Sequence, residues 1–226
     1  MTNVTPDAEG IKSSIINWSV LWRHFYQALI SILLALLIGA ALLLVSNRDP
    51  LVAYKSLFYG AFGSTDRIAE TLVKATPLLL IALSVSISFR CQIWNIGAEG
   101  QFIMGAIVST WIALTFSDLA KAILLPLTFI GGALGGAVWS LIAGLLKAYV
   151  QANEVITTSM LNYVAIYFLA YLVHGPMIDP SGFNFPQSPL ISKALELPRL
   201  ISGTRLNFAF IVALIMVGLG LVFWRT

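Results

Sequence analysis

The chain has 226 residues, of which 58% are hydrophobic and only 10% are charged, and its net charge is +3. Soluble domains carry about 25% charged residues, so this composition excludes an ordinary soluble domain and indicates a membrane protein. The 13 Lys and Arg residues form no cluster that would bind nucleic acid, and one cysteine with two distant histidines offers neither a disulfide nor a metal site, so we expect no metal and no cofactor.

Residues 1–24 are predicted to form a cytoplasmic or interfacial N-terminus ahead of a transmembrane domain, residues 25–226. Trp18 and Trp22 lie near Arg23, a pattern typical of the lipid headgroup zone, although ordinary helix packing explains these aromatic residues equally well. Six charge-free runs follow, each long enough, or nearly so, to cross about 30 Å of hydrocarbon as a helix. These predicted spans are residues 25–47, 75–89, 100–117, 122–146, 155–173 and 206–224. The fold class is therefore an all-α polytopic membrane protein with six transmembrane helices, and residues 48–74 form its first loop.

A polar segment with two glycines, residues 89–101, separates the second and third spans. Its candidate functional residues are Asn95, Gly97, Glu99, Gly100 and Gln101. A polar turn is costly in lipid unless protein or water covers it, so the segment predicts a helix break beside protein or a polar path, with a short surface loop as the simpler alternative. Glu99 also suits the positive N-terminus of the third span, which leaves structural support and direct substrate contact both open.

The fourth span carries small residues at intervals of four. Gly132, Gly136, Ser140 and Gly144 share one face of a helix. In lipid, such a face lets two helix backbones approach closely, so we expect it to press against another helix of this protein or of a partner. A general tolerance of membrane helices for glycine is the alternative explanation.

The fifth span begins with a capping pattern and then carries polar side chains. Asn153 is a predicted N-cap, and Glu154 lies in the first turn, where a negative charge is favourable. Thr158 and Asn162 follow at an interval of four and therefore share a face. Polar residues inside a span face protein or water, so these two either form hydrogen bonds between helices or line a substrate path.

The last loop, residues 174–205, is long and rich in proline. It holds five of the 9 prolines, together with Gly175, Gly182 and Gly203. Such a composition predicts an ordered, irregular loop rather than a seventh span.

Three stretches of the sequence carry a family pattern. They are residues 76–80 (TPLLL) leading through Phe89-Arg90 into residues 94–101 (WNIGAEGQ), then residues 153–163 (NEVITTSMLNY), and, less specifically, Tyr54 with residues 60–63 (GAFG). Together they resemble the permease subunits of ATP-binding cassette (ABC) importers. The most similar branch carries nucleosides and simple sugars and is related to the branched-chain amino-acid permeases. The resemblance extends over residues 50–175, which is more than half of the chain.

The resemblance implies a fold and a set of partners. Permeases of this family have about ten helices in two inverted repeats of five, and they lie in the cell (inner) membrane. They work as a pair of permease subunits with cytoplasmic ATPase subunits and an extracytoplasmic substrate-binding protein. The sequence has no Gly-Lys-Ser/Thr phosphate loop and no catalytic set, so we expect the chain not to be an enzyme and ATP hydrolysis to occur on the separate ATPase. Nucleosides are the expected substrates, with simple sugars next.

The orientation in the membrane follows from the resemblance rather than from charge. The family places both ends of the permease in the cytoplasm. With that orientation, the inner side holds five of the 13 Lys and Arg residues, namely Lys12, Arg23, Arg90, Lys147 and Arg225. The positive-inside rule therefore points weakly the other way.

Two other readings concern the class of protein and its extent. A stand-alone secondary transporter or channel for a small polar solute is the main alternative, but ion coupling normally needs charged groups within the spans, and these span interiors are charge-free.

The chain ends directly after the sixth span, where the family continues with an ATPase-docking segment and four further spans. We therefore expect a truncated permease that cannot couple ATP hydrolysis to transport by itself and that exposes Thr158 and Asn162 to the absent half. A short relative completed by another polypeptide is the alternative.

Overall fold

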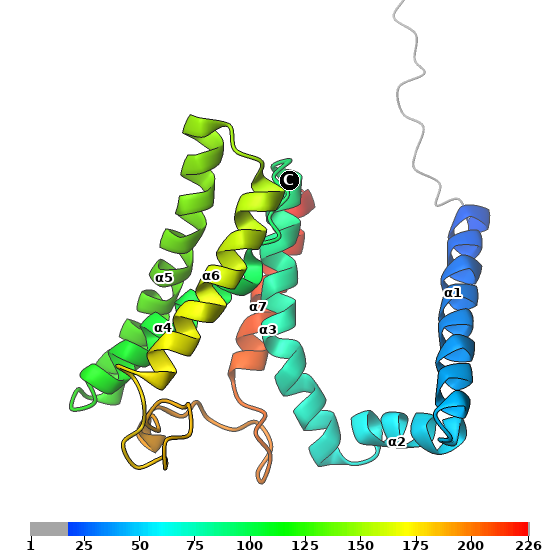
Figure 1. Ribbon diagram of the computed structural model, residues 1–226, viewed down its shortest axis with the longest axis horizontal. Helices are drawn as coiled ribbons and strands as arrows, with labels where there is room; N and C mark the ends of the chain where they lie inside the picture. The colour runs from blue at the N-terminus through cyan, green and yellow to red at the C-terminus, as the bar shows by residue number, and fades with distance from the viewer. Residues whose placement is uncertain (1–17, 226) are drawn as a thin grey trace, which may run out of the picture. The chain divides into compact units, whose positions relative to one another are not determined.

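The computed structural model describes residues 18–225, and most of the predicted N-terminal segment 1–24 lies outside them. The helices, labelled in Figure 1, are α1 (Trp18–Val45), α2 (Pro50–Phe62), α3 (Thr65–Arg90), α4 (Ala98–Thr115), α5 (Lys121–Val150), α6 (Glu154–His174) and α7 (Ala209–Arg225), with a short 3₁₀ turn, η1 (Lys193–Leu195). Across residues 18–225 the one β-type pairing is an isolated bridge between Arg199 and Asn207. The predicted all-α class is therefore confirmed. Contacts divide the chain into two units, Met1–Ser64 and Thr65–Thr226.

The first unit contains α1 and α2, and it corrects the predicted first loop. Residues 48–74 were expected to be a loop, but they form α2 and the start of α3. Asp49 caps α2 by accepting a hydrogen bond from the Leu51 N–H at 2.8 Å, and Pro50 occupies the first helical position, where proline is tolerated. The Tyr54 hydroxyl donates a hydrogen bond to the Leu36 carbonyl at 2.5 Å and so ties α2 to α1. The capping residues of α2, not its hydrophobicity, were the signal that the prediction missed.

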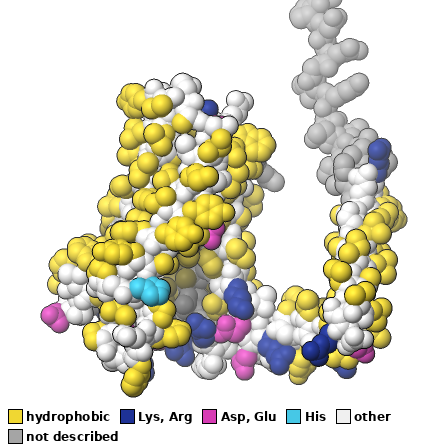
Figure 2. All heavy atoms as spheres, viewed as in Figure 1, with side chains coloured by type: hydrophobic (Ala, Val, Ile, Leu, Met, Phe, Trp, Pro, Cys, Tyr) yellow, Lys and Arg dark blue, Asp and Glu magenta, His cyan; other side chains and the backbone are white. Residues whose placement is uncertain are grey.

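Four of the six predicted spans are confirmed as helices that are long and apolar enough to cross a membrane. They are Phe25–Val45, Thr65–Arg90, Lys121–Val150 and Glu154–His174. The other two also form helices in the predicted places, but α4 has only 18 residues and begins with polar ones, and α7 has 17. Hydrophobic side chains cover most of the visible face of α5 and α6 (Figure 2). This distribution suits lipid as the surrounding solvent, and the chain is a multi-pass membrane protein.

The second unit is built around α4, which packs on both α5 and α6. Gly105 of α4 faces Gly132 of α5, and Gln101 faces Gly136, so these two helices run antiparallel. A Cβ atom built on Gly105 would lie 2.8 Å from the Gly132 carbonyl oxygen, which shows that the two backbones touch. α7 packs along α3, and the two helices lie side by side in Figure 1. The α3 residue Arg90 donates a hydrogen bond to the Phe223 carbonyl at 3.4 Å.

The predicted small-residue face of α5 packs against α4 in its first half, whereas no helix described within residues 18–225 covers its second half. A Cβ atom on Gly132 or Gly136 would meet α4 at 2.3 Å or 3.1 Å, whereas one on Gly144 would meet nothing within 4 Å. Ser140 is half-buried and, with Gly144, lines a cavity instead. The reason is geometric. α4 begins at Ala98 and runs antiparallel to α5. The part of α5 that follows about Ser140 therefore extends beyond the N-terminal end of α4.

This difference between two glycines of the same face gives a matched pair of variants. We expect Gly136→Leu to lower the unfolding midpoint of the purified protein in detergent, because the added side chain meets the Gln101 carbonyl of a backbone that cannot yield. Overpacking of this kind costs about 1–3 kcal/mol. Gly144→Leu is the control and should leave the midpoint unchanged. Equal midpoints for the two variants would contradict the proposed α4–α5 contact.

Candidate functional site

The predicted helix break between α3 and α4 is confirmed and is shorter than predicted. α3 ends at Arg90, and α4 begins at Ala98, so residues 91–97 form the break. Gln92 adopts a left-handed conformation, with φ of 58°, that turns the chain directly after α3. Glu99, Gly100 and Gln101 belong to the polar segment predicted as a break, but they form the first turn of α4, where Glu99 was also predicted to suit the positive helix N-terminus.

The buried Asn95 side chain holds the break together through hydrogen bonds. Its side chain is only 7% exposed, and its Oδ1 accepts a hydrogen bond from the Gly97 N–H at 2.9 Å. The Asn95 and Gln101 carboxamides also exchange two longer hydrogen bonds, of 3.4 Å and 3.3 Å. Asn95 therefore ties the end of the break to the first turn of α4, as asparagine commonly does in turns.

Two side chains of α6 satisfy the backbone on either side of Gly97. The Thr158 hydroxyl accepts a hydrogen bond from the Ile96 N–H at 3.2 Å and donates one to the Glu154 carbonyl at 2.6 Å. The Asn162 carboxamide accepts from the Gly100 N–H at 2.8 Å and donates to the Ile96 carbonyl at 2.9 Å. Hydrogen bonding to a neighbouring segment, one of the two roles left open by the sequence, is therefore observed for both side chains, and Thr158 also lines a cavity.

These contacts also correct the expectation that Thr158 and Asn162 face an absent half of the protein. Thr158 is only 4% exposed, and both side chains lie against the break of their own chain. The close approach requires glycine. A Cβ atom on Gly97 would lie 2.9 Å from the Thr158 Cβ, and one on Gly100 would lie 3.1 Å from the Asn162 Cα. The two glycines predicted as functional are thus needed for helix packing.

The start of α4 lies beside Thr158 and Asn162, which belong to the candidate membrane span Glu154–His174. Thr158 and Asn162 are four and eight residues beyond Glu154, the first residue of α6. At about 1.5 Å per residue, their contacts with α4 lie roughly 6–12 Å along α6. Helix N-termini carry unpaired N–H groups and a partial positive charge. In this protein, α6 supplies partners for backbone groups that lipid could not satisfy.

The entry to α6 is built as predicted. The Asn153 Oδ1 accepts hydrogen bonds from the Val155 and Ile156 N–H groups at 3.0 Å and 3.3 Å, which confirms the N-cap. Glu154 forms an ion pair with Lys147, at 2.6 Å, across the short turn from α5. The turn itself contains Gln151 in the left-handed region, with φ of 55°. Capping and pairing therefore fix where α6 begins.

A cavity of about 310 Å³ unites residues from all three predicted sets. We call it the entry cavity. The break contributes Asn95 and Gln101, and Lys147 and Glu154 add a paired charge. The residues that line it are Ser88, Ile93, Asn95, Gln101, Ser140, Ala143, Gly144, Lys147, Ala148, Glu154 and Thr158. Some residues of each predicted set thus meet at one place. The predicted residues that do not line this cavity are Gly97, Glu99, Gly100, Gly132, Gly136, Asn153 and Asn162.

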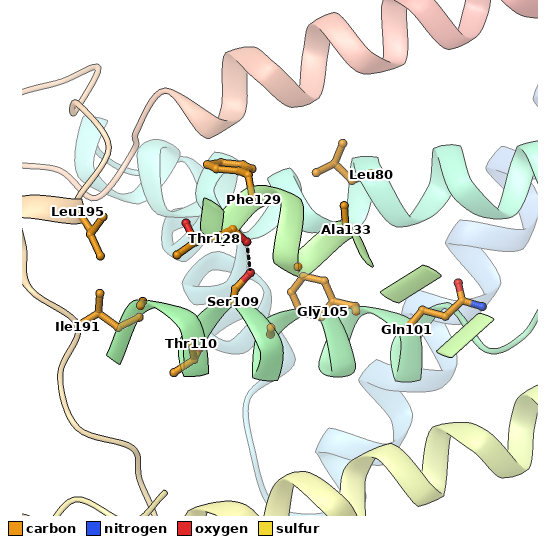
Figure 3. A pocket seen from close by; sticks show the side chains of 14 residues that line it. Leu80, Gln101, Gly105, Ser109, Thr110, Thr128, Phe129, Ala133, Ile191 and Leu195 are labelled. Carbon is orange, nitrogen blue, oxygen red and sulfur yellow. Dashed lines mark hydrogen bonds between the residues drawn. The ribbon is translucent and has the colours of Figure 1, made fainter. Parts of the chain in front are cut away.

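A second cavity, of about 590 Å³, lies between α3, α4, α5 and the loop before η1. We call it the central cavity. Figure 3 shows Gln101 at one end of it and Ile191 with Leu195 at the other. The Ser109 hydroxyl donates a hydrogen bond to the Thr128 carbonyl at 2.8 Å, the dashed line in Figure 3. Its lining residues are Leu80, Gln101, Phe102, Gly105, Ala106, Ser109, Thr110, Ala113, Thr128, Phe129, Gly132, Ala133, Ile191 and Leu195. Gln101 lines both cavities.

The central cavity was missed by the sequence analysis, although its polar residues were visible there. Ser109, Thr110 and Thr128 are hydroxyl residues inside predicted spans, the same signal that singled out Thr158. None of the lining residues is charged, and two are phenylalanines. Over residues 18–225, no group of three His, Cys, Asp or Glu side chains gathers that could hold a metal ion. The cavity can therefore offer hydrogen bonds and aromatic surface to a neutral solute.

Comparison with known proteins adds a family and several relatives. Residues 67–226 match the family described as branched-chain amino acid transport system / permease component. The glucose ABC transporter permease protein TsgB13 of Haloferax volcanii is 40% identical over 79% of this chain and 47% of its own length. The nucleoside ABC transporter permease protein NupB of Lactococcus lactis is 33% identical over 90% and 58%, and the guanosine ABC transporter permease protein NupP of Bacillus subtilis is 35% identical over 85% and 55%. The chain thus spans about half the length of these curated relatives. No solved structure matches.

The hydrogen bonds of Asn162 predict a stability effect. We expect Asn162→Leu to lower the unfolding midpoint in detergent, because the Gly100 N–H and the Ile96 carbonyl lose their side-chain partner. A buried polar group left unpaired costs about 1–3 kcal/mol. Ser159→Ala is the control, since the Ser159 hydroxyl bonds only to Val155 of its own helix. An Asn162→Leu protein as stable as Ser159→Ala would show that α6 does not hold the break.

Proposed function

This chain belongs to the permease family of branched-chain amino acid transport systems, and from that membership we propose that it is the transmembrane permease subunit of an ABC importer that moves nucleosides or simple sugars into the cell. The observation that carries the proposal is the match of residues 67–226 to this family. The relatives named for nucleoside, guanosine and glucose transport support the substrate class.

The two cavities support a neutral polar substrate. The central cavity has no charged lining residue, and the one charged pair at the entry cavity, Lys147 and Glu154, is already neutralised by its ion pair. Ion-coupled transporters normally carry unpaired acids or bases along the path. The hydroxyl and carboxamide groups instead suit a solute rich in hydroxyl groups. Gln101, which lines both cavities, is the side chain we place along the substrate path.

The other predicted residues have supporting roles in this proposal. Gly97 and Gly100 let α6 approach the break, while Gly132 and Gly136 let α5 approach α4. Asn153 and Glu154 fix the start of α6, and Ser140 with Gly144 borders the entry cavity. A helix break held this firmly gives the substrate path a defined shape.

The transporter we propose contains further components. Cytoplasmic ATPase subunits hydrolyse ATP, a second permease subunit pairs with this one, and an extracytoplasmic binding protein delivers the substrate. We also propose that all six predicted spans cross the bilayer, that both ends of the permease are cytoplasmic, and that the spans belong to a ten-helix fold of two inverted repeats. The family supports each of these statements.

Uptake by intact cells tests the proposal. In the native host, deletion of the gene should abolish ATP-dependent uptake of radiolabelled guanosine or glucose, and the complete gene supplied on a plasmid should restore it. Gly97→Leu should fail to restore uptake, since its side chain would clash with Thr158. Val164→Leu, at an exposed position of α6, is the matched control. Uptake that survives deletion of the gene, or that continues after ATP depletion, would refute the proposed function.

A further inference from the structure

Gln101 lies where the two cavities meet. Among residues 18–225, it is the one residue that lines both the entry cavity and the central cavity. In Figure 3 its side chain lies at one end of the central cavity and extends away from Gly105 and Ser109. Its hydrogen-bond partner Asn95 lines the entry cavity. The Asn95 and Gln101 side chains, which we call the carboxamide pair, therefore lie at the boundary between the two cavities.

The carboxamide pair is held together weakly. Its two hydrogen bonds are 3.4 Å and 3.3 Å long, whereas N–H···O bonds in proteins mostly measure about 2.7–3.2 Å. Within the described part of the chain, the Gln101 side chain forms no other hydrogen bond. A carboxamide offers two N–H donors and an oxygen with two lone pairs. One donor and one lone pair of Gln101 thus remain free for a ligand.

Asn162 carries the same chemical group in the same region and shows the contrast. Its carboxamide forms shorter bonds, of 2.8 Å and 2.9 Å, to backbone groups at the start of α4, and it lines neither cavity. The backbone of Gln101, unlike its side chain, is fixed. Its N–H donates to the Gly97 carbonyl at 3.1 Å, and its own carbonyl lies against Gly136 of α5. The Gln101 side chain can therefore change partners while the helix stays in place.

We propose that Gln101 is a substrate-binding gate between the two cavities. Its bonds to Asn95 close the passage, and the passage opens when the substrate replaces Asn95 as the partner of the Gln101 carboxamide. This inference rests on the proposed function and assigns a specificity-determining residue to it. The exchange favours neutral solutes that present a hydrogen-bond donor beside an acceptor, because such a solute can replace both bonds. Adjacent hydroxyl groups of a sugar and the edge of a nucleobase both meet this requirement.

Uptake by native-host cells, with the complete gene on a plasmid in place of the chromosomal copy, tests the gate. Gln101→Met keeps the length of the side chain but removes its donors and its acceptor. We expect the maximal rate of uptake of guanosine, or of glucose if the wild type takes up glucose, to fall roughly 5-fold to 100-fold, as for the loss of two hydrogen bonds between neutral groups. The unfolding midpoint in detergent should stay unchanged, because the lost bonds are long. Gln27→Met makes the same change at an exposed residue of α1 and should alter neither value.

A thiol at the gate gives a measurement that does not depend on transport. In permeabilised cells, Gln101→Cys combined with Cys91→Ser should react with a small methanethiosulfonate reagent. The transported solute should slow this reaction in a saturable manner, because it occupies the gate. Ser117→Cys, in the exposed turn between α4 and α5, is the control and should react equally fast with and without the solute.

Each other outcome has a separate meaning. A normal uptake rate in Gln101→Met would show that the substrate needs no bond from Gln101. A slow Gln101→Met protein with a lowered unfolding midpoint would assign Gln101 to support of the break, and an unprotected thiol in Gln101→Cys would place the substrate elsewhere. Each of these three results overturns the inference and leaves the proposed function intact. A wild type that takes up neither guanosine nor glucose contradicts the proposed function, and the inference with it.

Discussion

The structure of the second unit depends on one constraint, which is that backbone N–H and C=O groups inside a bilayer must find partners within the protein. A helix that begins within a membrane span exposes its first N–H groups where no water can form hydrogen bonds with them. α4 begins beside residues of the candidate span Glu154–His174, and backbone groups at its start find partners in Asn95 from the break and in Thr158 and Asn162 from α6. These three polar side chains are therefore structural requirements of the position of α4.

The other features of this region follow from that arrangement. Side chains of α6 can reach the backbone of the break only if the helices touch, which explains glycine at positions 97 and 100. On its other side, α4 approaches the backbone of α5 equally closely, and Gly105 lies against Gly132 there. With glycine contacts on two sides, α4 is held by both neighbours, and the face that carries Phe102, Ala106 and Thr110 borders the central cavity.

Local patterns in the sequence predicted local structure well. The break after Arg90, the N-cap at Asn153 and most of the helices depend on residues close together in the chain, and each lies where it was predicted. The errors concern which parts of the chain meet. Helical periodicity placed Gly144 on the packing face but could not show that α4 begins too late in the chain to cover it. Thr158 and Asn162 were predicted to face protein or water, and their partner, the break, could not be deduced from spacing. The central cavity combines residues from three helices and a loop, so no single stretch revealed it.

The distance along the chain between the break and its partners has a consequence for how the protein is made. The Ile96 and Gly100 N–H groups bond to side chains 62 residues further on. During synthesis, α4 leaves the ribosome before α6 exists, so the start of α4 has no partner for its exposed amides when it first meets the membrane. Closing such a long loop must precede any stabilisation from it. The hydrogen bonds that hold the start of α4 can therefore form only after the α5–α6 hairpin has been made.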